Sequence, residues 1–273
     1  MPQDSKGYSY AEEKAEPEKK EKKKNKLSVV IILLAVMVII ACVVYIGSMF
    51  INEHSAQVSY GQIAEIAINS DSGGNGKVSS PVDLESLNKI NNEVYAWLRV
   101  PGTHVDYPVV QSTVSDNYYL HRSIYKRYLF AGMIYTQSCN SLSFTDPVTV
   151  IYGHNMRSKT MFSTLHYFSD PSFFEKNDTF YIYTMDRILT YKIVSAYKYD
   201  SRHIMNAFDF SNPEVLRNFQ QHTLNPVATL RNVRSDVELD ENSKLVILST
   251  CMTNDKKSRF LVNGVLISDV PIS

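Results

Sequence analysis

Cysteine, tryptophan and net charge are all scarce in this sequence. Its 273 residues include three Cys and one Trp, and 28 Lys and Arg side chains balance 28 Asp and Glu. So few cysteines exclude a disulfide-dense secreted scaffold. Because the charges balance, no overall field would attract nucleic acid, and we expect no nucleic-acid partner. The sequence also has no fixed-period repeat or collagen-like tract, which excludes solenoid and fibrous folds.

Aromatic residues are abundant by contrast, with 18 Tyr and 12 Phe, and such residues favour strands. Apolar residues at steps of three and four predict a helix over 84–98, capped by Asp83. Ser211-Asn212-Pro213-Glu214 predicts the start of a second helix, with Ser211 as its cap, in the long connection before a cysteine-bearing strand. Short strands are predicted at 104–111, 132–136, 148–152, 179–183, 188–197, 245–249 and 259–268.

These elements indicate a mainly β fold with added helices. Seven or eight short strands predict a closed or nearly closed β-barrel. A β-sandwich would have much the same strand pattern, so the sequence alone leaves this alternative open.

A long uncharged run near the start predicts a membrane segment. Residues 1–26 end in KKEKKKNK, and residues 27–52 then contain no charged side chain. About 20 residues suffice to cross a bilayer as a helix, whereas the apolar core of a cleaved signal peptide has about 7–15. A retained anchor is therefore favoured over a signal peptide. Lysines mark cytoplasmic flanks, so we expect a cytoplasmic N-terminus in the cell membrane, a stalk over 53–82 and an extracellular domain over 83–273.

Cys251 stands at the end of a predicted strand, LVILSTC, where a thiol can reach solvent. Arg259 begins the next predicted strand after a seven-residue loop. If the two strands pair antiparallel, about 4.8 Å apart, the loop brings both residues to the same end of the sheet. A guanidinium there can favour the thiolate and donate hydrogen bonds to an oxyanion. A disulfide between Cys251 and Cys139 is the structural alternative, and a loop-ordering role is the alternative for Arg259.

His154 is the predicted partner of this cysteine. In IYGHNM a strand ends at Tyr152, Gly153 permits a tight turn, and His154 follows. A cysteine nucleophile requires a nearby base or imidazolium, which histidine usually supplies. The other six histidines have no comparable strand-Gly-His setting.

Four passages taken together resemble the sortases, and class B sortases in particular. They are WLRVPGTHVDYPVVQ (97–111), DNYYL (116–120), IYGHNM continued by SKTMFSTL (151–165), and LSTC (248–251) followed by Arg259. The order of cytoplasmic tail, anchor, spacer and domain is also similar to the family's layout. The resemblance covers residues 83–268.

The resemblance implies a cysteine transpeptidase. Cys251 would attack a Thr carbonyl in the sorting motif of a secreted protein and form a thioester. His154 would act as acid and base, Arg259 would hold the oxyanion, and Ser249 and Thr250 would line the substrate groove. The acceptor would be an amine of peptidoglycan, and no metal or organic cofactor is implied.

Two departures from the family pattern and two other functions stay open. IYTQSCNS (134–141) stands where many class B members have a Phe-x-Asp phrase, and it contains Cys139, which is either an idle thiol or a redox partner of Cys251. The loop after Cys251 has no aromatic residue, so the groove would accept a different motif. A pilin-polymerising sortase that uses a Lys amine and a non-catalytic, membrane-tethered wall-binding domain are the alternative functions.

Overall fold

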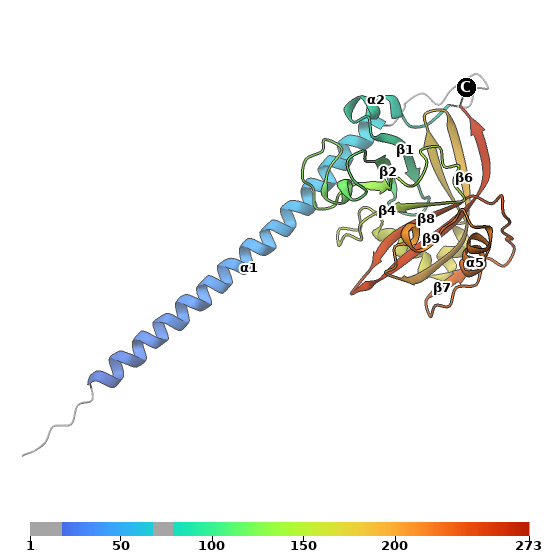
Figure 1. Cartoon of the computed structure of the whole chain (residues 1–273). Coiled ribbons are helices and arrows are strands. Elements are labelled where there is room, and N and C mark those ends of the chain that lie inside the picture. Colours follow the sequence, from blue (N-terminus) through green and yellow to red (C-terminus); the bar gives the residue numbers. More distant parts are fainter. Residues whose placement is uncertain (1–17, 68–78, 273) are drawn as a thin grey trace, which may run out of the picture. The chain divides into compact units, whose positions relative to one another are not determined.

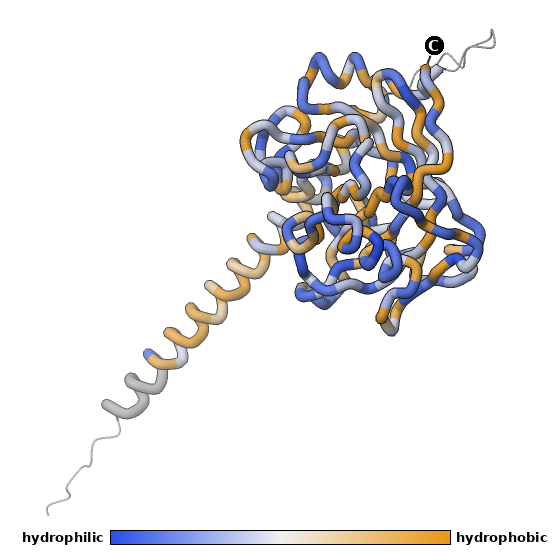
Figure 2. The backbone as a smooth tube through the Cα atoms, turned by 45° about the vertical axis from the view of Figure 1, so that its right-hand side comes forward, coloured by the Kyte–Doolittle hydropathy of each residue, from blue (hydrophilic) through white to orange (hydrophobic). Residues whose placement is uncertain are grey.

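The N-terminal part of the structure is one long helix. The computed structural model describes residues 18–67 and 79–272, and α1 (Glu18–Ala67) occupies the whole of the first range (Figure 1). Residues 1–17 of the predicted tail and residues 68–78 of the predicted stalk lie outside the described residues. Within α1, Lys26–Ser48 is long and apolar enough to cross a membrane. Figure 2 shows this apolar run along the helix.

The chain divides into two compact units, residues 1–50 and 51–273. The second unit therefore includes the end of α1. There the hydroxyl of Tyr60 donates a hydrogen bond to the carbonyl of Gly132. The helical part of the predicted stalk, 53–82, is thus in contact with the barrel. Three residues of this part are buried in the main hydrophobic core: Tyr60, Ile63 and Ala67.

The second unit is a closed β-barrel. The strand order is β5-β1-β2-β3-β4-β8-β9-β6-β7, and a further pairing of β5 with β6 closes the first eight strands into a ring. The barrel prediction is thereby confirmed and the sandwich alternative is excluded, while β7 extends the sheet beyond β6. The elements, of which η1 and η2 are 3₁₀-helices, are α2 (Leu84–Ile90), β1 (Val94–Arg99), β2 (Asp106–Gln111), η1 (Tyr118–His121), β3 (Ile134–Thr136), β4 (Val148–Tyr152), η2 (Ser163–Ser169), α3 (Pro171–Lys176), β5 (Thr179–Thr184), β6 (Arg187–Asp200), α4 (Ile204–Ala207), α5 (Pro213–Leu224), β7 (Arg231–Val233), β8 (Leu245–Met252) and β9 (Asp255–Pro271).

The predicted helix over 84–98 is wrong in its second half. Asp83 does cap the helix, since its carboxylate accepts a hydrogen bond from the Ser86 amide at 2.9 Å, but α2 ends at Ile90. The Asn91 side chain accepts a hydrogen bond from the Glu93 amide at 3.1 Å, which offers the backbone an alternative to the helical pattern. Residues of the apolar stripe beyond this point lie in β1, paired with β2 and β5.

A second hydrophobic cluster lies outside the barrel, between its wall and the helices α4 and α5. Alternate residues of β8 point to opposite faces, so Leu245 and Ile247 pack in this outer cluster while Val246 and Leu248 pack in the barrel core.

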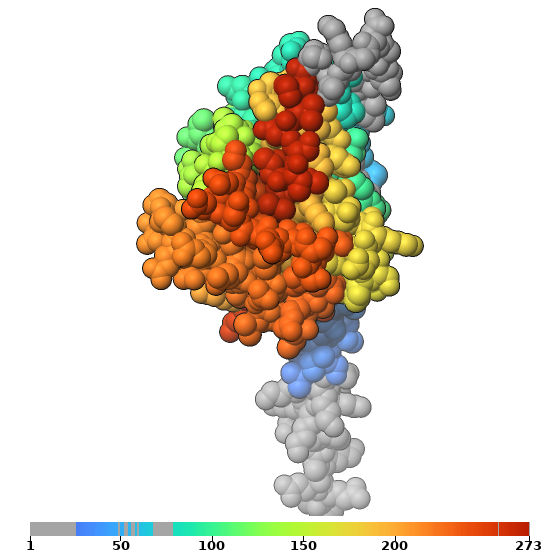
Figure 3. All heavy atoms as spheres, turned by 90° about the vertical axis from the view of Figure 1, so that its right-hand side faces the viewer, coloured from blue at the N-terminus to red at the C-terminus, as the bar shows by residue number. Residues whose placement is uncertain are grey.

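The helix predicted before the cysteine-bearing strand is confirmed as α5. Its cap is Asn212 rather than Ser211, because the Asn212 side chain accepts hydrogen bonds from the amides of the first turn. Figure 3 shows the orange segment that carries α5 beside the red strand β9.

The predicted loop between Cys251 and Arg259 is mostly strand. β8 continues to Met252, and β9 begins at Asp255 and pairs with it directly. The turn between them contains Asn254 with a φ of 63°, a left-handed conformation that asparagine tolerates better than most residues. A register shift between Cys251 and Met252 accommodates the extra residues on β9.

Candidate active site

Strand pairing brings Cys251 and Arg259 together. The two residues are direct antiparallel partners in the β8–β9 ladder, so their side chains lie on the same face of the sheet. This is the outer face, which also carries Ile247 and Leu261 of the outer cluster. Cys251 is an exposed free thiol and Arg259 is half-buried. The predicted proximity of a thiol and a guanidinium is therefore present in the fold.

A second pairing places His154 at the level of Cys251. Strands β4 and β8 are parallel, with Tyr152 opposite Ser249, and the Gly153 amide donates a hydrogen bond to the Ser249 carbonyl at 3.2 Å. Cys251 lies two residues beyond Ser249, and His154 lies two residues beyond Tyr152. Because parallel strands advance together, both residues reach the same end of the wall.

Gly153 is needed where the chain turns away from β4. A Cβ atom at this position would lie 2.6 Å from the Cδ1 atom of Ile134 and 2.6 Å from the Cγ atom of Phe162. Both side chains are fully buried. Close packing, rather than a left-handed backbone, therefore favours glycine here.

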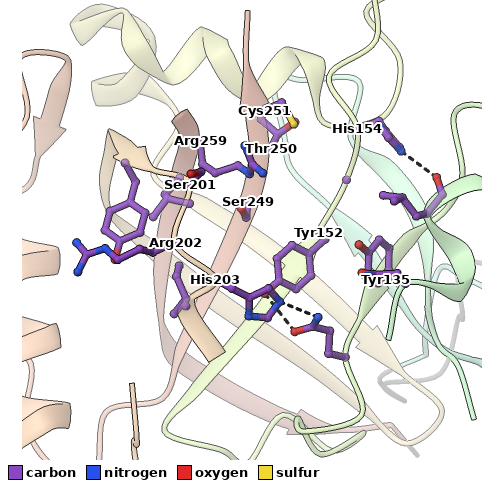
Figure 4. Close-up of a pocket in the computed structure, with 17 residues that line it drawn as sticks. Tyr135, Tyr152, His154, Ser201, Arg202, His203, Ser249, Thr250, Cys251 and Arg259 are labelled. Atoms are coloured by element: carbon purple, nitrogen blue, oxygen red, sulfur yellow. Dashed lines mark hydrogen bonds between the residues drawn. The ribbon is translucent and has the colours of Figure 1, made fainter. Parts of the chain in front are cut away.

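The imidazole of His154 is held by a backbone carbonyl. Its Nε2 lies 2.8 Å from the carbonyl oxygen of Leu120, which can only accept, so Nε2 carries a proton. In the neutral ring Nδ1 is then the unprotonated nitrogen. Figure 4 shows the Nε2 edge turned towards Leu120 and away from Cys251. Burial lowers the pKa of His154, and the neighbouring His121 lowers it further, whereas the bond to Leu120 acts in the opposite direction.

Two residues without an assigned role in the sequence prediction hold the backbone of the cysteine. The Asn155 amide nitrogen Nδ2 donates to the Cys251 carbonyl at 3.0 Å and to Thr253 Oγ1 at 3.0 Å. His166 Nε2 lies 3.1 Å from the same carbonyl. Asn155 directly follows His154, so this contact links the two walls of the site. The position of Asn155 within IYGHNM was the available sequence signal, whereas nothing local distinguished His166.

Cys251, His154 and Arg259 line a cavity of about 230 Å³. All five residues predicted for the site line it, although Ser249 and Thr250 are themselves buried. The connection after β6 supplies another wall, which the sequence prediction missed because that segment is far from Cys251 along the chain. In Figure 4, Arg202 and His203 approach from this side. The full lining comprises Asn117, Leu120, Tyr135, Gln137, Tyr152, Gly153, His154, Tyr199, Ser201, Arg202, His203, Ile204, Ser249, Thr250, Cys251, Arg259 and Leu261.

Cys139 takes no part in this cavity. It is an exposed free thiol, as is Cys251, so the alternative disulfide is not formed in the structure. Partial desolvation of its sulfur, followed by the nearby charge of Asp116, raises the pKa of Cys139. Within the described residues, no group of three or more His, Cys, Asp or Glu side chains is arranged to hold a metal ion.

Comparisons with known proteins identify the family of this chain. A sequence model of the sortase domain matches residues 98–267, more than half of the chain. Sortase B of Listeria monocytogenes is 29% identical over 202 residues, which cover 71% of this chain and 77% of that protein.

Solved structures show the same similarity. A Staphylococcus aureus sortase B–substrate complex has a TM-score of 0.60 at 27% identity, covering 68% of this chain and 84% of that one. A Streptococcus pyogenes class B sortase involved in pilus biogenesis has a TM-score of 0.57 at 30% identity, covering 67% and 97%. The chain belongs to the sortase family, and its relatives are the class B cysteine transpeptidases.

Proposed function

We propose that this protein cleaves a sorting motif in secreted proteins and transfers the acyl part to a cell-wall peptidoglycan amine. The observation that carries the proposal is the register of three strands. The β8–β9 ladder pairs Cys251 with Arg259, and the β4–β8 pairing brings His154 to the same end of one cavity. A thiol, an imidazole and a guanidinium there are the groups that acyl transfer through a thioester requires.

The first half of the reaction forms the acyl-enzyme. Cys251 gives its thiol proton to Nδ1 of His154, and the resulting thiolate attacks the carbonyl carbon of a Thr in the motif. The guanidinium of Arg259 donates hydrogen bonds to the oxyanion that forms. The C–N bond then breaks, and the departing amine takes a proton from Nδ1 of His154. This nitrogen suits the role because Nε2 is already hydrogen-bonded to the Leu120 carbonyl.

The second half transfers the acyl group. An incoming amine gives a proton to His154 and attacks the thioester carbonyl, and the sulfur of Cys251 leaves as a thiolate. Ser249 and Thr250 line the groove beneath the substrate. Because both side chains are buried, we expect Ser249 and Thr250 to form the floor of the groove and to make few polar contacts with the substrate.

The proposed setting is the outer face of the cell membrane. Residues 1–26 form a cytoplasmic tail, 27–52 a single-pass anchor, 53–82 a linker, and 83–273 the extracellular catalytic domain. The Lys-rich N-terminal flank and the apolar segment Lys26–Ser48 support this orientation.

Pilus assembly is the second candidate function, because one similar structure is a class B sortase involved in pilus biogenesis. The two candidates differ in the acceptor amine, which belongs to peptidoglycan in one and to a pilin Lys in the other. The catalytic residues are the same in both.

The test is mass spectrometry of the full-length protein in detergent with a library of Pro-x-Thr pentapeptides. We expect a Thr-terminated acyl adduct on Cys251, absent from Cys251→Ala. Adding triglycine or a Lys-containing peptide then distinguishes the two acceptor classes by the mass of the product. A folded protein with a reduced Cys251 that forms no adduct and cleaves no peptide would instead support the non-catalytic wall-binding domain.

A further inference from the structure

A second histidine stacks on the candidate catalytic histidine. The ring centroids of His121 and His154 lie 5.2 Å apart, with 29° between the ring planes. Phe130 extends the stack, with its centroid 5.6 Å from that of His121 and 6.1 Å from that of His154. His154 therefore has two aromatic neighbours, neither of which lines the cavity that contains Cys251.

The segment that carries His121 is fixed by its own hydrogen bonds. His121 Nδ1 lies 3.0 Å from the Phe130 carbonyl, and the Leu129 amide donates to the His121 carbonyl at 3.1 Å. Leu120, whose carbonyl accepts the proton on His154 Nε2, is the residue directly before His121. One short stretch of chain thus supplies both the stacking ring and the hydrogen-bond acceptor.

We propose that His121 is a positioning residue for His154. It holds the imidazole by stacking so that Nε2 stays on the Leu120 carbonyl and Nδ1 stays available to the cavity. Because two imidazolium rings in contact repel each other, His121 also disfavours a proton on His154. The inference rests on the proposed function only in taking His154 as the acid–base group.

The charged surroundings support an effect specific to His121. His121 from η1 stacks on His154. The other titratable groups that line the cavity with His154 are Cys251, Arg259, Tyr135, Tyr152, Tyr199, Arg202 and His203. Two other cations of the segment have partners elsewhere, since Arg122 lies over the Tyr118 ring at 4.5 Å and Lys126 pairs with Glu93 at 2.9 Å. Two imidazoles in contact disfavour double protonation, and the contact with His121 lowers the pKa of His154 in addition to the larger effect of burial.

Two substitutions separate stacking from charge. His121→Phe keeps a flat ring against His154 but removes the ionisable group, and His121→Ala removes both. The matched control is His104→Phe, because His104 Nδ1 also lies at a backbone carbonyl, that of Lys159 at 3.1 Å, but the residue is exposed and outside the cavity.

The primary measurement is the titration of His154 by NMR in the full-length protein in detergent, with histidine ring carbons labelled and His154→Gln used for assignment. It requires no substrate, so it is independent of whether the proposed reaction is correct. We expect the midpoint of His154 to move to higher pH in His121→Phe and to stay unchanged in His104→Phe. An unchanged midpoint in His121→Phe would refute the electrostatic part.

The second measurement is the rate of peptide cleavage, with thermal unfolding as the check on folding. We expect His121→Ala to lower kcat about 10-fold with little change in KM, and His121→Phe to restore it to within about two-fold of the wild type at pH 7.5, since the ring alone preserves the alignment. Equal kcat in His121→Ala and the wild type would refute the positioning role. If His121→Ala does not fold, the test uses His121→Phe instead. A large loss of kcat in a folded His121→Phe protein would refute the positioning role.

Discussion

Two walls of the candidate active-site cavity, the one that carries Cys251 and Arg259 and the one that carries His154, are built in different ways. Cys251 and Arg259 stand on neighbouring strands whose ladder fixes them as direct partners. His154 lies in a loop beyond the end of β4 and is held by two contacts with η1, namely the Leu120 carbonyl and the His121 ring. A strand ladder is held by many hydrogen bonds at once, so one lost contact changes it little. A loop-held residue depends on each of its few contacts, so the histidine wall is the part of the site most open to perturbation.

The largest expected effect on activity comes from a substitution in the strand-built wall, at Cys251. Cys251→Ala removes the nucleophile, and we expect acyl transfer to fall by at least about 1,000-fold. Because the side chain is exposed, thermal unfolding should be unchanged. The matched control is Cys139→Ala, which removes the other exposed thiol of the barrel unit and should leave activity intact. Loss of activity in that control would instead support a redox link between the two cysteines.

Arg259→Lys tests whether the guanidinium acts through its shape or through its charge alone. Lysine keeps the charge but has no planar fork of donors, so we expect kcat to fall about 100-fold with little change in stability. Arg187→Lys serves as the control, because Arg187 pairs with Asp269 on the barrel surface away from the cavity. Full activity of Arg259→Lys would mean that only a positive charge is required.

Gly153→Ala tests the packing beneath the histidine wall. The added Cβ would overlap Ile134 and Phe162, so we expect the free energy of unfolding to drop by about 1–3 kcal/mol and activity to fall about 10-fold as His154 shifts. Gly61→Ala is the control, since a Cβ there meets nothing within 4 Å in a helix. Thermal unfolding and peptide cleavage measure both effects, and a Gly153→Ala protein as active as the wild type would show that the histidine wall tolerates displacement.

Asn155→Ala removes the hydrogen bonds that join the two walls. We expect a loss of about 1 kcal/mol in unfolding free energy and about a five-fold loss in kcat. Asn88→Ala loses a comparable bond to a backbone carbonyl, at 2.9 Å from Val94, but lies outside the cavity. It should show the stability loss alone, and an equal kcat loss in both variants would argue against a specific role for Asn155.

The smallest expected effect concerns pH. Burial lowers the pKa of both His154 and His166 from 6.5, so below about pH 6.5 the unfolded chain binds protons that the folded protein does not. The free energy of unfolding should therefore decrease as the pH falls from 6.5 towards the lower folded values and should be insensitive to these groups above that range. Thermal melts from pH 5 to 8 measure this. A His166→Phe variant should show a weaker decrease, and an identical slope would contradict the assignment.

Sequence patterns predicted most of the barrel but misjudged three local features: the end of the first helix, the cap of α5 and the loop between Cys251 and Arg259. The hairpin of β5 and β6 and the buried runs of β8 and β9 alternate or are continuously apolar, and these signals are local. The stripe over 84–98 was read as one helix because its spacing fits a helix as far as Leu98. Asn91 and the pairing of β1 with two other strands decided otherwise, and neither is visible in the periodicity of the stripe.

By itself the sequence determined the apolar N-terminal segment, the β-rich domain and the residue types of the site. These follow from composition, periodicity and short motifs, which act over neighbouring residues. Only the tertiary structure decided how the residues face one another. The parallel pairing of β4 with β8 sets the level of His154, and the contacts of His121, Asn155 and His166 join segments up to 98 residues apart. Such contacts depend on strand order and barrel closure, which no local pattern encodes.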